Sequence, residues 1–325
     1  MQEETATNRP DLSLFAEKIQ QLREHIGQVI VGQQNAVELI LTAILADGHV
    51  LIEGVPGVAK TLLAKLIARL IDARFSRVQF TPDLMPSDVL GTTVFNMQTQ
   101  QFVFHAGPVF ADIVLVDEIN RAPAKTQAAL FEVMEERQAT VDGQRHPMGP
   151  LYTILATQNP VEQEGTYKLP EAQLDRFMMK INMGYPSLDD EVEILNRHLN
   201  SSFNVSLDSV EAILTQEDLL ALRKTLTQVY VEPSLLRYIA QIIEQTRQSK
   251  SIFLGASPRA SVAIMQASRA YALLQGRDFV SPDDIKQVAP AVLCHRIILT
   301  AEAEMEELTP QRVVLQLIEK VEVPK

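Results

Sequence analysis

One stretch of this chain has the pattern of a phosphate-binding loop, Leu51-Ile52-Glu53-Gly54-Val55-Pro56-Gly57-Val58-Ala59-Lys60-Thr61-Leu62-Leu63. The apolar run from His49 to Glu53 predicts a short buried strand, and the leucine and isoleucine spacing after Thr61 predicts a helix. A glycine-bearing turn separates the two, and strand, loop and helix in this order are the context that such a loop requires. Backbone N–H groups of the loop and the first helical turn would point at a phosphate, which the helix dipole also favours.

The residues of this loop suggest individual roles. Lys60 would reach the β- and γ-phosphate oxygens, and the Thr61 hydroxyl would ligate Mg²⁺. The other expected nucleotide-binding residues are those of the loop and the first helical turn: Gly54, Val55, Pro56, Gly57, Val58, Ala59 and Leu62. The usual pattern, G-x-x-x-x-G-K-[ST], has glycine where this chain has Ala59, and the methyl group costs roughly 1–2 kcal/mol if the position needs φ > 0. An ordinary glycine turn is the alternative interpretation.

Composition and charge narrow the class of protein. The 325 residues suffice for two domains, and 46% hydrophobic with 22% charged residues is typical of a soluble globular chain. A net charge of −12 gives no diffuse basic surface for nucleic acid or an anionic membrane. The one cysteine, Cys294, excludes an internal disulfide and fits a reducing compartment. The six histidines are scattered without ligand spacing, so we expect no dedicated metal site.

Neither a targeting signal nor a membrane span is expected. Residues 1–10 are polar and acidic, without the charged-then-apolar pattern of a secretory signal. The longest apolar stretch, near Leu39 to Ala46, is far shorter than the ~20 residues that a membrane-spanning helix needs. We therefore expect a cytoplasmic protein.

A second motif is the apolar run Ile113 to Val116 with Asp117 and Glu118 directly after it. Four large apolar residues in a row predict a central strand buried on both faces, and ligands bind at the carboxyl ends of strands in open α/β sheets. Asp117 is expected to hold the Mg²⁺ shell while Glu118 polarises the attacking water. A solvated strand end is the alternative, which the upstream Lys60 makes less favourable.

Further strands and helices complete the expected organisation. We expect an α/β core over residues 1–184, with an insertion at about 81–105 that contains a hairpin and a second hairpin at about 138–148. Asn159 ends a strand, where it could orient the lytic water or touch the γ-phosphate; a turn asparagine before proline is equally compatible. After Tyr185 no apolar strand runs appear and helices begin with clear caps, so residues 185–325 are expected to form an all-helical domain.

Two arginines of this sequence have alternative local interpretations. Arg176 precedes the last expected core strand, where an arginine is usually ion-paired or on the surface. Arg259 starts a helix, where the dipole disfavours a cation, so an anionic partner and ordinary surface placement are both open.

With these residues collected, the chain resembles an AAA+ ATPase and, more narrowly, the MoxR family. The motifs that carry the resemblance are Gly54–Thr61, Asp117–Pro123, Lys125–Leu130, Ala156–Pro160 and Leu174–Phe177. The resemblance covers nearly the whole chain, from Val29 to about Pro324, and Ala59 looks like the usual variant of this family.

The resemblance implies an α/β fold of the P-loop NTPase class. Its three-layer AAA+ core would hold a parallel five-stranded sheet with inserted hairpins, followed by a C-terminal all-helical lid domain. By the same resemblance Val31, Gly32 and Gln33 would lie beside the adenine. Asn159 would be sensor 1 and Arg176 the arginine finger offered to a neighbouring subunit's ATP.

Two further arginines take roles only by resemblance. Arg259 would be sensor 2, and Arg121 is a second candidate for a cation that acts across a subunit interface. Because the lid is displaced in part of this branch, Arg259 could serve its own or a neighbour's nucleotide.

The implied cofactors are ATP and Mg²⁺, and the implied assembly is a homo-oligomeric ring, a hexamer as in the wider family. Family members look like chaperones that, with a von Willebrand factor A domain partner, insert metals or mature enzyme complexes. ATP hydrolysis that remodels a protein client is therefore the leading expectation. A nucleic-acid motor or loader and a metal-chelatase motor subunit are the alternatives, and the acidic charge argues against the first of these. A small-molecule kinase is least favoured because Asp117 with Glu118 suits attack by water.

Overall fold

The computed structural model describes residues 13–159, 167, 169–199 and 210–324. Contacts within the chain divide it into two compact units. The sheet unit contains residues 25–216, and the helical unit contains residues 217–325 together with the N-terminal residues up to Glu24. This division differs from the domain boundary expected at residue 185, which stays a prediction. Among the described residues, no helix is both long and apolar enough to cross a membrane.

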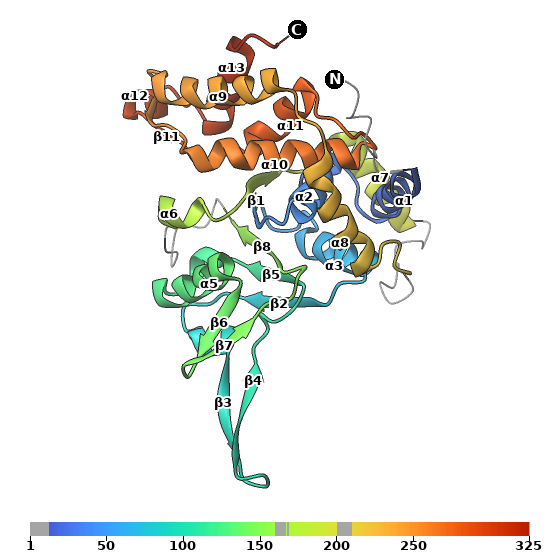
Figure 1. Cartoon of the computed structure of the whole chain (residues 1–325), viewed down its shortest axis with the longest axis vertical. Coiled ribbons are helices and arrows are strands. Elements are labelled where there is room, and N and C mark those ends of the chain that lie inside the picture. The colour runs from blue at the N-terminus through green and yellow to red at the C-terminus, as the bar shows by residue number, and fades with distance from the viewer. Residues whose placement is uncertain (1–12, 160–166, 168, 200–209, 325) are drawn as a thin grey trace, which may run out of the picture. The chain divides into compact units, whose positions relative to one another are not determined.

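The sheet unit is built on a five-stranded sheet in the order β2-β5-β8-β1-β9 (Figure 1). Its strands are β1 (Val50–Gly54), β2 (Phe75–Gln79), β5 (Ile113–Asp117), β8 (Thr153–Gln158) and β9 (Met179–Met183). Every neighbouring pair is parallel, which confirms the expected sheet. All carboxyl ends of the strands therefore lie along one edge, where ligands bind in such folds.

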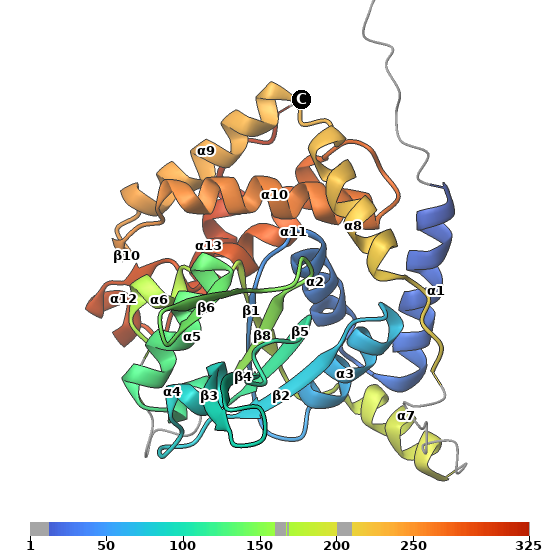
Figure 2. The ribbon, with the colours of Figure 1, turned by 60° about the horizontal axis from the view of Figure 1, so that its bottom comes forward.

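Helices cover both faces of this sheet. The covering helices are α2 (Gln34–Leu45), α3 (Lys60–Leu70) and α5 (Ala124–Glu136), and α7 (Leu188–Leu199) follows β9. The first helix, α1 (Ser13–Val29), begins in the helical unit and ends in the sheet unit. Figure 2 shows α5 on one side of the sheet and α2 and α3 on the other. Val114 and Val116 share a buried core with Phe131 of α5, which accounts for the apolar run of residues 113–116 in β5. The three-layer core is thus the one expected.

Two hairpins extend from the sheet unit, as the sequence predicts. One consists of β3 (Gly91–Asn96) and β4 (Gln101–Ala106) after the short helix α4 (Pro86–Leu90), and the other of β6 (Gln138–Val141) and β7 (Gln144–Pro147). The β3–β4 hairpin leaves large apolar side chains exposed, namely Val94, Phe95, Met97 and Phe102, and Met97 at its tip is 81% exposed. The exposed side chains of this hairpin are therefore not part of the core.

The helical unit consists mainly of α9 (Pro233–Gln248), α10 (Pro258–Leu274), α11 (Pro282–Leu293), α12 (Ala301–Met305) and α13 (Pro310–Lys320), with α8 (Gln216–Thr225) leading into it and η3 (Leu226–Gln228) before α9. The expected caps are present: the hydroxyls of Ser281 and Thr309 accept N–H groups of α11 and α13. A short antiparallel sheet of β10 (Ile252–Leu254) and β11 (Ile298–Leu299) departs from the all-helical expectation. Two or three residues per strand are too few to give a periodic signal.

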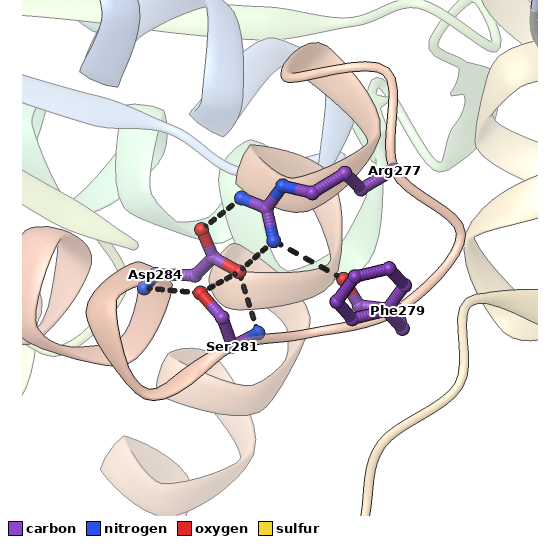
Figure 3. A network of polar contacts seen from close by, with 4 residues as sticks. All are labelled: Arg277, Phe279, Ser281 and Asp284. Atoms are coloured by element: carbon purple, nitrogen blue, oxygen red, sulfur yellow. Dashed lines mark hydrogen bonds and ion pairs between the residues drawn. The ribbon is translucent and has the colours of Figure 1, made fainter.

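A polar network closes the loop between α10 and α11 (Figure 3). Gly276 adopts φ +71° just after α10, and Arg277 then forms two hydrogen bonds with the Asp284 carboxylate. The backbone N–H and hydroxyl of Ser281 donate to the same carboxylate at 2.7 and 2.9 Å. The buried charge of Asp284 is thereby neutralised and hydrogen-bonded, as burial of a carboxylate requires.

Candidate nucleotide site

The loop between β1 and α3 contains two residues with positive φ. Gly57 adopts φ +88° and Ala59 adopts φ +61°, so the position of Ala59 does need the left-handed region. A non-glycine residue there costs roughly 1–2 kcal/mol. Strain of this kind persists where the surrounding structure enforces it. Here the strained residue lies at the start of α3. Backbone N–H groups and the helix dipole can bind an anion at this position.

Lys60 is the first residue of α3, and its amine turns back toward the loop. The Lys60 Nζ donates to the Gly54 carbonyl oxygen at 2.6 Å. Burial lowers the pKa of Lys60, and the carboxylates of Asp117 and Glu118 act in the opposite direction. Gly54 ends β1 and Asp117 ends β5 of the same parallel sheet, so Lys60 and the two carboxylates form one cluster at its carboxyl edge.

Asp117 receives hydrogen bonds from both strands that flank β5. The Thr157 hydroxyl on β8 donates to its Oδ1 at 3.1 Å, and Arg77 Nε on β2 donates to its Oδ2 at 2.6 Å. The Asp117 side chain is 10% exposed, so these two donors account for a carboxylate held close to the protein interior. Thr157 and Arg77 were not singled out from the sequence, because their relevance depends on strand register.

Glu118 leaves the strand in a different direction from Asp117. It adopts φ +57°, and its backbone N–H donates to the Thr157 hydroxyl at 3.0 Å. Its carboxylate accepts a hydrogen bond from Gln79 Nε2 at 2.8 Å and forms an ion pair with Arg121 at 3.1 Å. The two carboxylates thus have separate partners, as two separate roles at one strand end require.

The remaining predicted residues of the sheet unit occupy its borders. Asn159 follows β8 and is buried, while its neighbours 160–166 lie outside the described residues. Arg176 lies between α6 (Glu171–Leu174) and β9, forms an ion pair with Glu135 at 3.2 Å and donates to the Ala172 carbonyl at 3.1 Å. The local expectation of an ion-paired arginine is confirmed, and the roles of both residues with nucleotide stay predictions.

Residues Val31, Gly32 and Gln33 lie against the chain after β9. The Gln33 side-chain amide donates to the Gly184 carbonyl at 3.0 Å. Gly32 adopts φ +74°, and a Cβ there would meet the Asp190 carboxylate at 2.8 Å, so the position requires glycine. Contact with adenine stays a prediction for these three residues. Arg259 is the second residue of α10 in the helical unit, and its role as sensor 2 also stays a prediction.

The oxygen ligands of this site fit a cation that arrives with a nucleotide. Thr61 and Asp117 offer one hydroxyl and one carboxylate, and Mg²⁺ commonly takes one or two protein oxygens together with phosphates and water. Over the part of the chain that the structure describes, no three His, Cys, Asp or Glu side chains form a dedicated metal cluster. The residues therefore fit Mg²⁺ as a companion of ATP.

Comparison with known proteins gives the family. The model of the ATPase family associated with various cellular activities (AAA) matches residues 49–179, and an AAA lid domain matches residues 244–317. The protein YeaC of Bacillus subtilis is 46% identical over 301 residues, which cover 93% of either chain. Chaperone MoxR1 of Mycobacterium tuberculosis is 44% identical over 309 residues, covering 92% of this chain and 81% of that protein. This chain belongs to the MoxR family of AAA+ ATPases.

A solved structure supports the same assignment for this MoxR-family chain. The crystal structure of a Cytophaga hutchinsonii protein assigned as an ATPase matches it with a TM-score of 0.88 and 41% sequence identity, over 97% of this chain and 98% of that one. The MoxR-family chain is accordingly an ATPase and binds nucleotide, with an AAA core and a C-terminal helical lid.

Proposed function

We propose that Mg²⁺-dependent ATP hydrolysis at the β1–α3 loop drives conformational remodelling of a protein client. The observation that supports this most is the cluster of Lys60, Asp117 and Glu118 at the carboxyl edge of the sheet, where Lys60 is hydrogen-bonded to the last residue of β1 and Asp117 ends β5. Lys60 and the loop from Gly54 to Leu62 would hold the phosphates. Val31 to Gln33 would lie beside the adenine.

The two carboxylates divide the chemistry between them. Thr61 and Asp117 would hold Mg²⁺, which supplies charge neutralisation on the phosphates when bound. Glu118 would orient and polarise the attacking water, with Asn159 at the neighbouring strand end as its partner. The diverging hydrogen bonds of Asp117 and Glu118 support this division, because each carboxylate is positioned by its own donors.

We further propose a homo-oligomeric ring, a hexamer, in which Arg176 acts on a neighbour's ATP. Arg176 is 29% exposed beside Glu135, so its guanidinium can exchange an intrachain ion pair for a phosphate with little repacking. An arginine finger is worth ~10³–10⁵ in rate in other phosphate-loop systems, so a monomer would hydrolyse ATP weakly.

The relative named Chaperone MoxR1 supports a chaperone-like role. The exposed apolar residues of the β3–β4 hairpin suit contact with a protein client. We propose that this remodelling matures the client or inserts a metal into it. A protein with a von Willebrand factor A domain would act as the partner.

Mixed assemblies test the proposal. Glu118→Gln and Arg176→Ala are each expected to be inactive alone, because one lacks the water-polarising carboxylate and the other the finger. In a mixture, some interfaces pair an intact Glu118 site with an intact Arg176 from the neighbour, so part of the ATPase rate should return. A mixture of Lys60→Ala with Arg176→Ala subunits is the control for nucleotide binding. It asks whether the subunit that supplies Arg176 must itself bind nucleotide. Absence of recovery in the first mixture would show that Arg176 does not act across an interface.

A further inference from the structure

Arg77 is a prominent charge in the site that the proposed roles leave without a function. It lies on β2, and the register places β2 residue Gln79 directly opposite Asp117. Arg77 Nε donates to Asp117 Oδ2 at 2.6 Å, and its Nη2 reaches Gln79 Oε1 at 3.3 Å. The Arg77 side chain is 48% exposed, against 10% for Asp117. A solvated arginine thus holds a nearly buried carboxylate.

The contacts of Asp117 make this arginine more than a surface ion pair. Thr157 already donates to Oδ1, so Arg77 supplies the partner of the second oxygen and the orientation of the carboxylate is set from both sides. Gln79 then links Arg77 to Glu118 at 2.8 Å. Arg77 is therefore a cation hydrogen-bonded to the carboxylate that would face the metal.

We propose that Arg77 is a positioning residue that sets the affinity of the site for its divalent cation through Asp117. This inference rests on the proposed function, because it takes Asp117 as the carboxylate that faces the metal. A guanidinium on Asp117 neutralises part of the charge that attracts a divalent cation, while it also keeps the carboxylate oriented. Removal of the arginine charge should therefore tighten divalent-cation binding by about tenfold, the scale of a unit charge acting on a divalent cation across a few ångströms of water-like dielectric.

A matched control lies next to the same pair of strands, at their amino ends. Arg74 hydrogen-bonds to Asp112 through Nε at 3.0 Å and Nη2 at 3.1 Å, just before β2 and β5 begin. Five residues of strand separate Asp112 from Asp117, which corresponds to about 16 Å. Loss of Arg74 therefore removes the same kind of ion pair without changing the charge beside Asp117.

The experiment measures Mn²⁺ binding by electron paramagnetic resonance in the presence of a non-hydrolysable ATP analogue. Arg77→Met should bind Mn²⁺ about tenfold more tightly than the wild type, at the scale given above. Arg77→Lys, which keeps the charge, and Arg74→Met should both stay within about twofold. Arg77→Gln should behave like Arg77→Met, and it provides a second route if the methionine variant folds poorly. Binding of the analogue in EDTA is measured in parallel.

The outcomes separate this inference from the proposed function. If the wild type binds the analogue but both uncharged Arg77 variants keep wild-type Mn²⁺ affinity, Arg77 does not set the affinity and the inference fails alone. An equal shift in Arg74→Met would also overturn it, because the effect would then be general. If the wild type binds no analogue at all, the proposed nucleotide site fails and this inference fails with it.

Discussion

Two arginine–aspartate pairs join the same strands, β2 and β5, at opposite ends. Before the strands begin, Arg74 gives Asp112 three hydrogen bonds, from its backbone N–H at 2.9 Å and from its guanidinium at 3.0 and 3.1 Å. Where the strands end, Arg77 gives Asp117 a single bond at 2.6 Å. The two pairs share residue types, strands and a buried acid beside an exposed arginine.

The difference lies in what surrounds each acid. Asp112 is 3% exposed, and although burial acts to raise its pKa, the hydrogen bonds and charge of Arg74 outweigh it and the pKa is lowered. Asp117 lies in the cluster with Lys60 and Glu118. In a parallel sheet only the carboxyl edge meets the phosphate loop. The arginine–aspartate pair at the amino edge is therefore expected to contribute to stability, and the pair at the carboxyl edge to the candidate site. Changes at the two ends should therefore separate activity from stability.

The largest expected effect is on hydrolysis and comes from the carboxyl edge. Glu118→Gln should bind ATP yet hydrolyse it at least ~100-fold more slowly, the scale expected for loss of a general base. Its free energy of unfolding should change by less than about 1 kcal/mol, because Glu118 is partly exposed. Steady-state ATPase assays and urea unfolding measure the two quantities. A loss of activity of less than tenfold would contradict the claim that the carboxyl edge of the sheet carries the activity.

The corresponding change at the amino edge should affect stability. Asp112→Ala removes a buried acceptor of charged hydrogen bonds, so we expect a loss of about 2–3 kcal/mol in the free energy of unfolding. The contribution of the ion pair itself is small, because Arg74 is 68% exposed. The ATPase rate per folded molecule should stay within twofold of the wild type, to order of magnitude. A large fall in that rate at unchanged stability would contradict the division between the two edges.

A smaller effect should appear in the pH dependence of stability. Because the pKa of Asp112 is lowered in the folded protein, the unfolded chain binds more protons between that pKa and the unfolded value of about 3.9. The stabilisation is thus fully present above pH ~4 and is lost as pH falls through the folded pKa. Urea unfolding of wild type and Asp112→Asn should show a difference that shrinks only below about pH 4. A difference that stays constant into acid would exclude this linkage.

The smallest effect concerns the strained alanine of the loop. Ala59→Gly relieves a positive φ worth roughly 1–2 kcal/mol but adds freedom to the unfolded chain worth roughly 0.4–1 kcal/mol. The net stabilisation should therefore lie between roughly 0 and 1.6 kcal/mol, and ATP affinity should stay within threefold, to order of magnitude. Thermal unfolding and fluorescence titration with an ATP analogue measure both. Destabilisation by more than about 2 kcal/mol would show that the methyl group makes a packing contribution.

The sequence predicted most of the scaffold because its signals were strong and local. Four apolar residues before Asp117 identify β5, and the spacing around Lys60 identifies the loop and helix. The sequence left open whether Ala59 needs a positive φ, and the structure shows that it does. The five-stranded parallel sheet and both hairpins were predicted correctly. Gly32 carries no local signal of its contact with Asp190, which only the fold brings beside it.

The features that could not be predicted from the sequence depend on strand register or on very short strands. Arg77 and Gln79 look like ordinary polar positions of a strand, and only the pairing of Gln79 with Asp117 places them in the site. Thr157 gains its role in the same way from β8. The β10–β11 sheet was missed because its strands are too short for a pattern. The proposed oligomer and the role of Arg259 depend on arrangements beyond one chain or one unit.

The central claim is that ATP phosphates bind at the loop that ends in Lys60. The most direct test is the affinity of the protein for a fluorescent ATP analogue in the wild type, Lys60→Ala and Lys65→Ala. Lys65 is an exposed lysine on the same helix, so its loss is a matched control for charge. The claim predicts that Lys60→Ala abolishes binding while Lys65→Ala binds as the wild type does. Wild-type affinity in a folded Lys60→Ala variant would contradict it.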